Sequence, residues 1–84
     1  QKVKMARSLE WRLRREENYR RFYKEGAGLS TSFEKDVEVK KKLLIKYFPL
    51  RFGVGGKQDL RKYEPISIGA IFNYLINYAE KYAK

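Results

Sequence analysis

Residues 65–83 read PISIGAIFNYLINYAEKYA, and this segment has the clearest amphipathic pattern in the chain. Apolar side chains recur there at the three- and four-residue spacing of a helix, at Ile68, Ile71, Phe72, Leu75, Tyr78, Ala79 and Tyr82. The other side carries Gly69, Asn73, Asn77, Glu80, Lys81 and Lys84. We therefore predict a helix from Pro65 or Ser67 to Ala83, and we expect the core to form around it.

The N-terminal segment also has helical spacing. We predict a helix from about Lys2 to Glu25, ended by Gly26-Ala27-Gly28 as a C-terminal cap. Its apolar residues share one face when they are placed about 100° apart. They are Met5, Leu9, Leu13, Tyr19 and Tyr23.

The middle of the chain predicts a further helix. Thr31-Ser32-Phe33-Glu34 fits the capping box that opens many helices, and Pro49 ends the run. One helical face then holds Phe33, Val37, Leu44, Tyr47 and Phe48. A strand through Val37–Phe48 is the alternative, but the alternation that it requires fails at residues 40–45. Residues 50–64 contain Gly53, Gly55 and Gly56 and predict a loop, with a short helical turn near Asp59–Lys62.

Together these patterns predict an all-α fold, a small three-helix domain with glycine-rich connecting loops, and residues 1–84 as one basic domain. The chain has no cysteine and no histidine. Thiolate metal ligands and the commonest general base near neutral pH are therefore missing. We expect no enzyme, no catalytic residues, no metal site, no cofactor and no small-molecule substrate.

Two further patterns bear on the setting of the protein. No apolar run approaches the roughly 20 residues that span a bilayer, and no signal-peptide pattern opens the chain. We expect an intracellular protein, with membrane binding unlikely because all three apolar faces are needed for one core. Residues 53–58 are not a phosphate loop, because Arg51 stands where the first glycine is required and Gln58 replaces the hydroxyl residue.

The charge balance suggests the kind of partner. Twenty Lys and Arg residues face ten Asp and Glu residues, so the net charge is +10. Such an excess attracts polyanions, and basic rows on helices suit a phosphate backbone. We predict a module that binds nucleic acid, DNA or RNA, without catalysing a reaction. The residues predicted to bind it are Arg7, Arg14, Arg21, Lys35, Lys42 and Lys46.

Part of this charge has another explanation. Glu10–Arg14, Glu16–Arg20 and Glu17–Arg21 are spaced four apart with Glu first, which stabilises an exposed helix by roughly 0.2–0.5 kcal/mol per pair. These pairs account for three arginines without a ligand. They cannot neutralise the whole excess, so an anionic partner remains the favoured explanation.

An aromatic and arginine cluster suggests a second function. Trp11, Arg15 and Phe22 lie close together on the helical wheel, and Trp and Arg are enriched where proteins bind proteins. The alternative prediction is therefore an accessory protein that docks on an acidic protein partner through these residues. They could also stack on unpaired bases, or Trp11 and Phe22 could close the edge of the core. A homodimer through the tyrosine-rich last helix is a further option.

Overall fold

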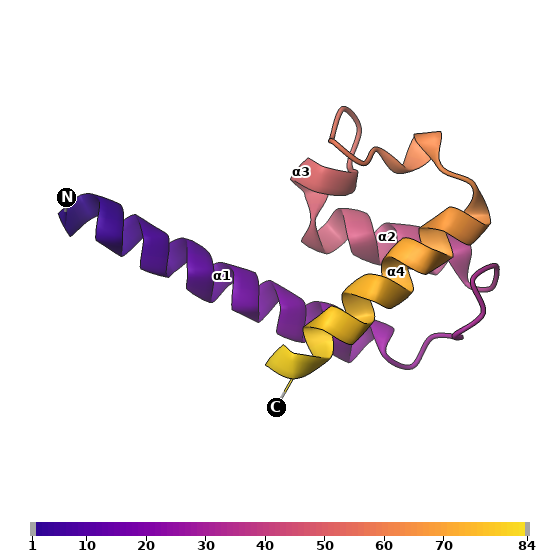
Figure 1. Cartoon of the computed structure of the whole chain (residues 1–84), viewed down its shortest axis with the longest axis horizontal. Helices are drawn as coiled ribbons and strands as arrows, with labels where there is room; N and C mark the ends of the chain where they lie inside the picture. The colour runs from indigo at the N-terminus through magenta and orange to yellow at the C-terminus, as the bar shows by residue number, and fades with distance from the viewer. Residues whose placement is uncertain (1, 84) are drawn as a thin grey trace.

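The computed structural model describes the backbone of residues 2–83 and the side chains of residues 12–83. Three long helices form the fold, α1 (Lys2–Gly26), α2 (Val37–Tyr47) and α4 (Pro65–Ala79) (Figure 1). Three short helical turns complete it, α3 (Pro49–Phe52), η1 (Leu60–Lys62) and η2 (Glu80–Tyr82). Residues 2–83 contain no strand. The all-α prediction is confirmed, and the strand alternative for Val37–Phe48 is wrong.

The three long helices each contact the other two, with α4 crossing in front of α1 and α2 in the view of Figure 1. Their shared core consists of eight buried apolar residues: Phe22, Leu44, Phe52, Leu60, Ile68, Phe72, Leu75 and Ala79. Phe22 lies at its centre, with ring centroids 5.2 Å from Phe72 and 5.3 Å from Phe48. Such edge-to-face pairs add about 0.5–1.5 kcal/mol to the burial of the rings themselves. The predicted role of the last helix as the centre of the core is supported, because five of its residues are fully buried.

The buried face of α1 differs from the predicted one. Leu13 is 63% exposed, whereas Phe22 is fully buried and Tyr19 and Tyr23 pack against the core. Tyr19, Phe22, Tyr23 and Gly26 form the true contact face, at helical spacing over the last two turns. Gly26 is buried there, and a Cβ at this position would lie 2.7 Å from the Phe72 ring. Met5 and Leu9 lie outside the described side chains.

The start of α2 also differs. The capping box at residues 31–34 does not open the helix, which begins at Val37 after Asp36 in the left-handed region (φ 58°). The Asp36 carboxylate accepts a hydrogen bond from the backbone N–H of Ser30 at 3.2 Å. The Ser30 hydroxyl accepts another from the N–H of Ser32 at 3.1 Å. These bonds fold residues 30–36 into turns, so Phe33 precedes the helix and is partly exposed.

This segment, residues 31–36, packs on α4 at Gly69. A Cβ at Gly69 would lie only 2.0 Å from the carbonyl oxygen of Phe33, so a side chain cannot fit. The Asn73 amide donates a hydrogen bond to the carbonyl of Thr31 at 3.1 Å. The buried Lys40 ammonium donates to the carbonyl of Ser32 at 2.7 Å. The side of α4 that we expected to be open to solvent is therefore covered by this segment at Gly69 and Asn73.

Residues 49–64 are more ordered than the predicted loop. Pro49 ends α2 as predicted, but it also opens the single turn α3, which suits a residue with a fixed φ and no N–H. The turn predicted near Asp59–Lys62 is confirmed by η1. The buried Asp59 carboxylate accepts hydrogen bonds from the N–H groups of Gly55 and Arg61, both at 3.0 Å, and pairs with the Arg61 guanidinium at 2.8 Å. These contacts, the Arg61 side chain first, hold the pKa of Asp59 well below its ordinary value.

Candidate nucleic-acid interface

A groove of about 420 Å³ lies between α1 and the junction of α2 with α3. We call it the cationic groove, and it is lined by Arg14, Arg15, Asn18, Tyr47, Phe48, Pro49, Leu50 and Arg51. Its floor is apolar and its rim carries three guanidinium groups. The groove exists because Pro49 breaks the helix after Tyr47 and turns the chain, so that Leu50 and Arg51 come to lie beside α1.

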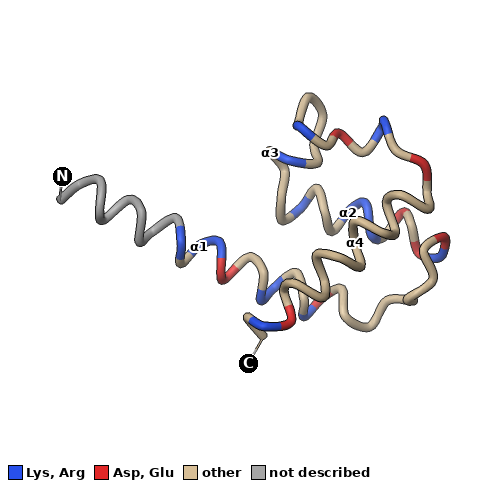
Figure 2. Tube along the Cα trace, viewed as in Figure 1, with Lys and Arg blue, Asp and Glu red and all other residues tan. Residues whose placement is uncertain are grey.

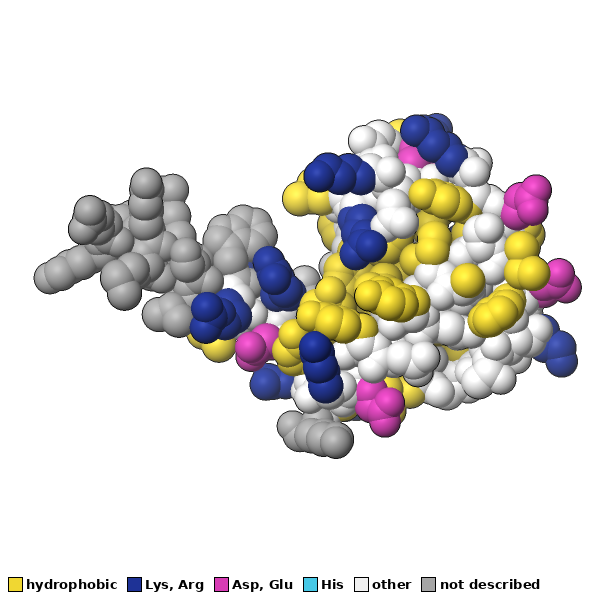
Figure 3. All heavy atoms as spheres, in the orientation of Figure 1, with side chains coloured by type: hydrophobic (Ala, Val, Ile, Leu, Met, Phe, Trp, Pro, Cys, Tyr) yellow, Lys and Arg dark blue, Asp and Glu magenta, His cyan; other side chains and the backbone are white. Residues whose placement is uncertain are grey.

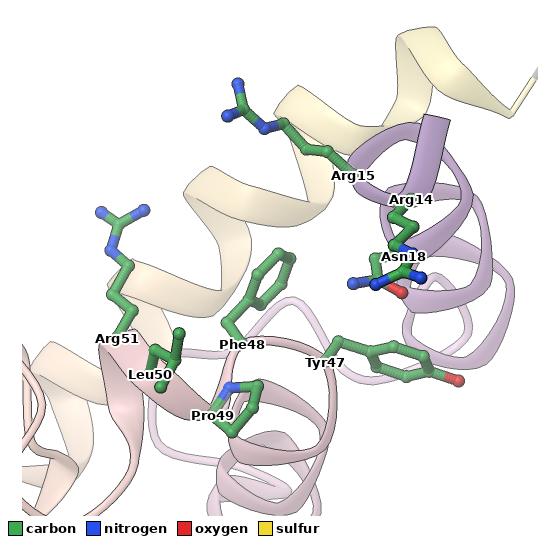
Figure 4. A pocket seen from close by; sticks show the side chains of 8 residues that line it. All are labelled: Arg14, Arg15, Asn18, Tyr47, Phe48, Pro49, Leu50 and Arg51. Carbon is green, nitrogen blue, oxygen red and sulfur yellow. The ribbon is translucent and has the colours of Figure 1, made fainter. Parts of the chain in front are cut away.

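The arginines approach the floor from two directions (Figure 4). Arg15 from α1 and Arg51 from α3 extend to the same side of the Phe48 ring, across the surface of α4. Arg14 and Asn18 point from α1 toward Tyr47 on the other side. An anionic ligand that enters beside Phe48 therefore meets two guanidinium groups that belong to segments 36 positions apart in the sequence.

Arg15 and Arg51 have no carboxylate partner in the described part of the chain. The ion pairs recorded there engage other cations, namely Arg20, Arg21, Lys41, Lys46 and Arg61. Arg51 instead donates from Nε to the Gln58 side chain at 2.5 Å, and its guanidinium carbon lies 5.1 Å from the Phe52 ring centroid. These contacts fix the direction of the Arg51 side chain and leave its positive charge available to pair with a phosphate.

A second surface adjoins the groove. Tyr74 and Tyr78 on α4 and Tyr82 on η2 follow one another at four-residue spacing, and we call them the tyrosine face. Tyr74 is 68% exposed and Tyr78 38% exposed. The Lys81 ammonium lies 3.9 Å from the centroid of the Tyr78 ring, in cation–π geometry. The face therefore combines exposed rings with a cation, although α4 itself contains no charged residue (Figure 2).

Tyr19 of α1 connects the two surfaces. Its ring centroid lies 5.3 Å from that of Phe48 in the groove and 5.2 Å from that of Tyr78 on the tyrosine face. Burial raises the pKa of Tyr19 most, the Tyr78 hydroxyl raises it further, and the nearby charges of Arg51 and Arg15 lower it. Both arginines thus act electrostatically on the ring that touches both surfaces. The groove and the tyrosine face form one continuous site.

The tyrosine hydroxyls at the end of this site interact with each other. The Tyr78 and Tyr82 oxygens lie 3.4 Å apart. The pKa of Tyr78 is lowered, first by this hydrogen bond and then by the positive charges of Lys81 and Arg15. The pKa of Tyr82 is raised, first by its hydrogen bond with Tyr78 and then by burial.

The arginines predicted to bind nucleic acid have different surroundings. Arg7 lies outside the described side chains. Arg14 lines the cationic groove. Arg21 is exposed and forms an ion pair with Glu17, and Arg20 pairs with Glu16 at 4.0 Å, so both of these helical pairs have formed as expected. The Glu10 member of the predicted Glu10–Arg14 pair lies outside the described side chains.

The three predicted lysines lie away from the groove. Lys35 is exposed in the segment that packs on Gly69, and Lys42 is exposed on the outer side of α2. Lys46 donates to the Glu25 carboxylate at 3.1 Å, and the Tyr47 hydroxyl donates to the same carboxylate. These hydrogen bonds, that of Tyr47 first, lower the pKa of Glu25. Of the five predicted cations whose side chains are described, only Arg14 lines the groove.

The predicted docking cluster needs a correction. Phe22 has no exposed surface and contacts Phe72 in the core, so it cannot serve as a surface anchor or stack on a base in this fold. Trp11 lies outside the described side chains. Arg15 belongs to the cationic groove, where sequence reasoning missed Arg51, and it also missed Tyr74 on the tyrosine face. Pro49 was the signal available for Arg51, since a proline often opens a new helical turn.

The space-filling view shows the same distribution of charge. In Figure 3 basic side chains gather along the side that runs from α3 to α1, around an apolar area, and acidic side chains lie at the opposite edge and beside α1. Among the described residues, no group of three or more acidic side chains is placed to hold a metal ion. None of the helices in the described part of the chain combines the length and apolar character needed to cross a bilayer.

Comparisons with known proteins return no match: no family model, no curated protein and no solved structure corresponds to this chain. The functional interpretation depends on the geometry and charge of the site alone.

Proposed function

We propose that this protein binds nucleic acid without catalysing a reaction, and that it contacts mainly the phosphate backbone through the cationic groove. The observation that carries the proposal is the pair Arg15 and Arg51, which flank an apolar floor and have no carboxylate partner among the described residues. Both side chains are exposed to solvent, so an anion can reach the two guanidinium groups and neutralise them. A run of phosphates supplies that anion.

The overall charge supports the same function. A net charge of +10 on 84 residues raises the local concentration of any polyanion and speeds its association. The proposed binding is not catalytic because the sequence lacks histidine and cysteine. In addition, the Asp59 and Glu25 carboxylates are held by neighbouring cations, which makes them poor bases.

The test compares two variants that lose the same charge in different places. Arg15→Gln with Arg51→Gln removes the groove charges, and Lys35→Gln with Lys62→Gln removes two exposed charges elsewhere. Binding of a fluorescent oligonucleotide is measured by anisotropy over a range of salt concentrations. We expect the groove variant to flatten the slope of log K against log salt by about 1.4–1.8, at 0.7–0.9 per lost phosphate contact. We expect the control variant to change the slope much less.

Two results would contradict the proposal. An equal change in both variants would mean that total charge alone, and no particular site, attracts the oligonucleotide. Oligonucleotide binding that the groove variant leaves unchanged at every salt concentration would remove the groove from the function. In the second case Lys35, which we also predicted as a contact, would be tested by the same control.

A second candidate function is docking on an acidic protein. It is favoured by Leu50, which is 86% exposed at the groove, because an apolar side chain gains nothing from a phosphate but is a suitable anchor for a protein. The same titration separates the two functions when polyglutamate competes with the oligonucleotide. Displacement by polyglutamate at equal charge concentration favours the acidic protein, and resistance to it favours nucleic acid.

A further inference from the structure

Within the tyrosine face, Tyr78 and Tyr82 contact the ring of Tyr19, but Tyr74 does not. Tyr74 projects from the middle of α4 with two thirds of its surface in water, and no ring pair in the described part of the chain includes it. Tyr78 is better held, by ring contacts with Tyr19 at 5.2 Å and Tyr82 at 5.8 Å. A large, poorly packed ring on a rigid helix beside unneutralised arginines is typical of a surface that binds a ligand.

We propose that the ligand of this site is a single-stranded nucleic acid, whose bases stack on Tyr74 and Tyr78 while Arg15 and Arg51 hold its phosphates. This inference rests on the proposed function and names the class of nucleic acid. Rings four residues apart on a helix are separated by about 6 Å along its axis, so each offers its own stacking surface. Tyr19 joins the Tyr78 ring to the groove, which places cations and rings within reach of one strand.

Single strands fit this site better than duplexes for a geometric reason. In a duplex the faces of the bases are covered by their neighbours, and only base edges and phosphates are open to a protein. The exposed rings would then contribute nothing. In a single strand the faces are free, and stacking on an aromatic side chain is favourable for every base, without preference for sequence. RNA and DNA single strands share this chemistry.

Lys81 strengthens the argument at the other end of the site. Its ammonium lies 3.9 Å from the Tyr78 ring centroid and 5.5 Å from that of Tyr82. A base that stacks on this face of Tyr78 must displace the ammonium, which can then pair with the phosphate of the same nucleotide. The site thus has cations at both ends, Arg15 and Arg51 at the groove and Lys81 on η2, with the exposed rings of α4 between them.

The experiment uses Tyr74→Ala, with Tyr74→Phe and Phe33→Ala as controls. Tyr74→Phe keeps the ring and loses only the hydroxyl, and Phe33→Ala removes a partly exposed ring from the segment that packs on Gly69. The probes are a labelled single strand as RNA and as DNA, the duplex of the same sequence, and an abasic strand of equal length. The abasic strand retains every phosphate but offers no base. Circular dichroism confirms that each variant is folded.

We expect the wild-type protein to bind both single strands more tightly than the duplex or the abasic strand. Tyr74→Ala should weaken binding of the single strand by about 5- to 150-fold, the measured range for one stacked base. It should leave abasic and duplex binding, and the salt slope, unchanged. Tyr74→Phe and Phe33→Ala should bind like the wild type.

Other results separate the inference from the proposed function. Equal affinity for single strand, duplex and abasic strand, unaffected by Tyr74→Ala, would overturn the stacking inference and leave backbone binding in place. Failure to bind any of these probes would overturn both. Loss of binding as protein concentration rises would show that the tyrosine face joins two copies of the chain, and would also overturn the inference.

Discussion

Replacing Gly69 by Ala tests the packing of the fold, because two physical effects predict opposite signs. Gly69 lies inside α4, where Ala is a better helix former by about 1 kcal/mol. If only local propensity mattered, the variant would be more stable than the wild type. The structure predicts the reverse, because a Cβ would lie 2.0 Å from the carbonyl oxygen of Phe33 and 2.6 Å from its Cα.

The size of the effect follows from what must move. The contact is with backbone, so no change of rotamer relieves it, and residues 31–36 must withdraw from α4. That movement lengthens the hydrogen bond from Asn73 to Thr31 and the bond from the Lys40 ammonium to Ser32. A neutral hydrogen bond contributes about 1 kcal/mol and a charged one about 1.5–3 kcal/mol. After the gain in helix propensity, we expect a net destabilisation of about 2 kcal/mol.

Urea unfolding followed by circular dichroism measures the free energy of unfolding directly. A loss of about 2 kcal/mol corresponds to a fall in Tm of about 8–16 °C for a domain of this size. The matched control is Gly28→Ala, because no atom lies within 4 Å of a Cβ built there. This control should be neutral, or stabilising by up to about 1 kcal/mol. A Gly69→Ala protein as stable as the wild type would refute the packing of residues 31–36 on α4.

Two further predictions concern the core and the loop. Phe22→Ala should lower the free energy of unfolding by about 3–5 kcal/mol, because the ring is fully buried, and urea denaturation should then show little native protein. A urea midpoint equal to that of the wild type would contradict the burial of Phe22. The pKa of Asp59 is lower in the folded protein than in the unfolded chain, so the unfolded chain binds the proton more readily. The stability that Asp59 contributes should therefore be fully present above the ordinary pKa of 3.8 and fall as the pH drops below it. Asp59→Asn should flatten this acid dependence of Tm, and an unchanged acid limb would contradict the role assigned to Asp59.

The helices could be predicted where the pattern of apolar residues is long and few tertiary contacts compete with it. Residues 65–83 predicted α4 and η2 almost to the residue, and residues 2–25 predicted α1. The start of α2 could not be predicted in the same way. Its apparent capping box satisfies a local rule, but Asp36 and Ser30 form competing turns that let the chain pack against Gly69. The sequence of residues 31–34 alone gives no indication that this segment packs against Gly69.

The buried face of α1 was predicted wrongly for a related reason. A helical wheel averages over the whole segment, and the apolar residues near the N-terminus drew the predicted face toward Leu13. Among the described side chains of α1, those that contact the core lie in its last turns, where Tyr19, Phe22 and Tyr23 meet α2 and α4. A wheel drawn over residues 19–26 alone would have placed Phe22 inside. Which face of α1 is buried depends on how much of the helix contacts the core, and sequence periodicity does not show that length.

The candidate site depends still more on tertiary structure. The excess of positive charge was visible in the composition, but its concentration at Arg15 and Arg51 results from apolar contacts beneath them. The Phe48 ring packs on Tyr19 at 5.3 Å and on Phe52 at 6.1 Å, and so fixes α3 against α1. The aromatic packing beneath them brings the two guanidinium groups to the same groove. Since the groove forms only in the folded chain, a polyanion that binds there should also stabilise the fold.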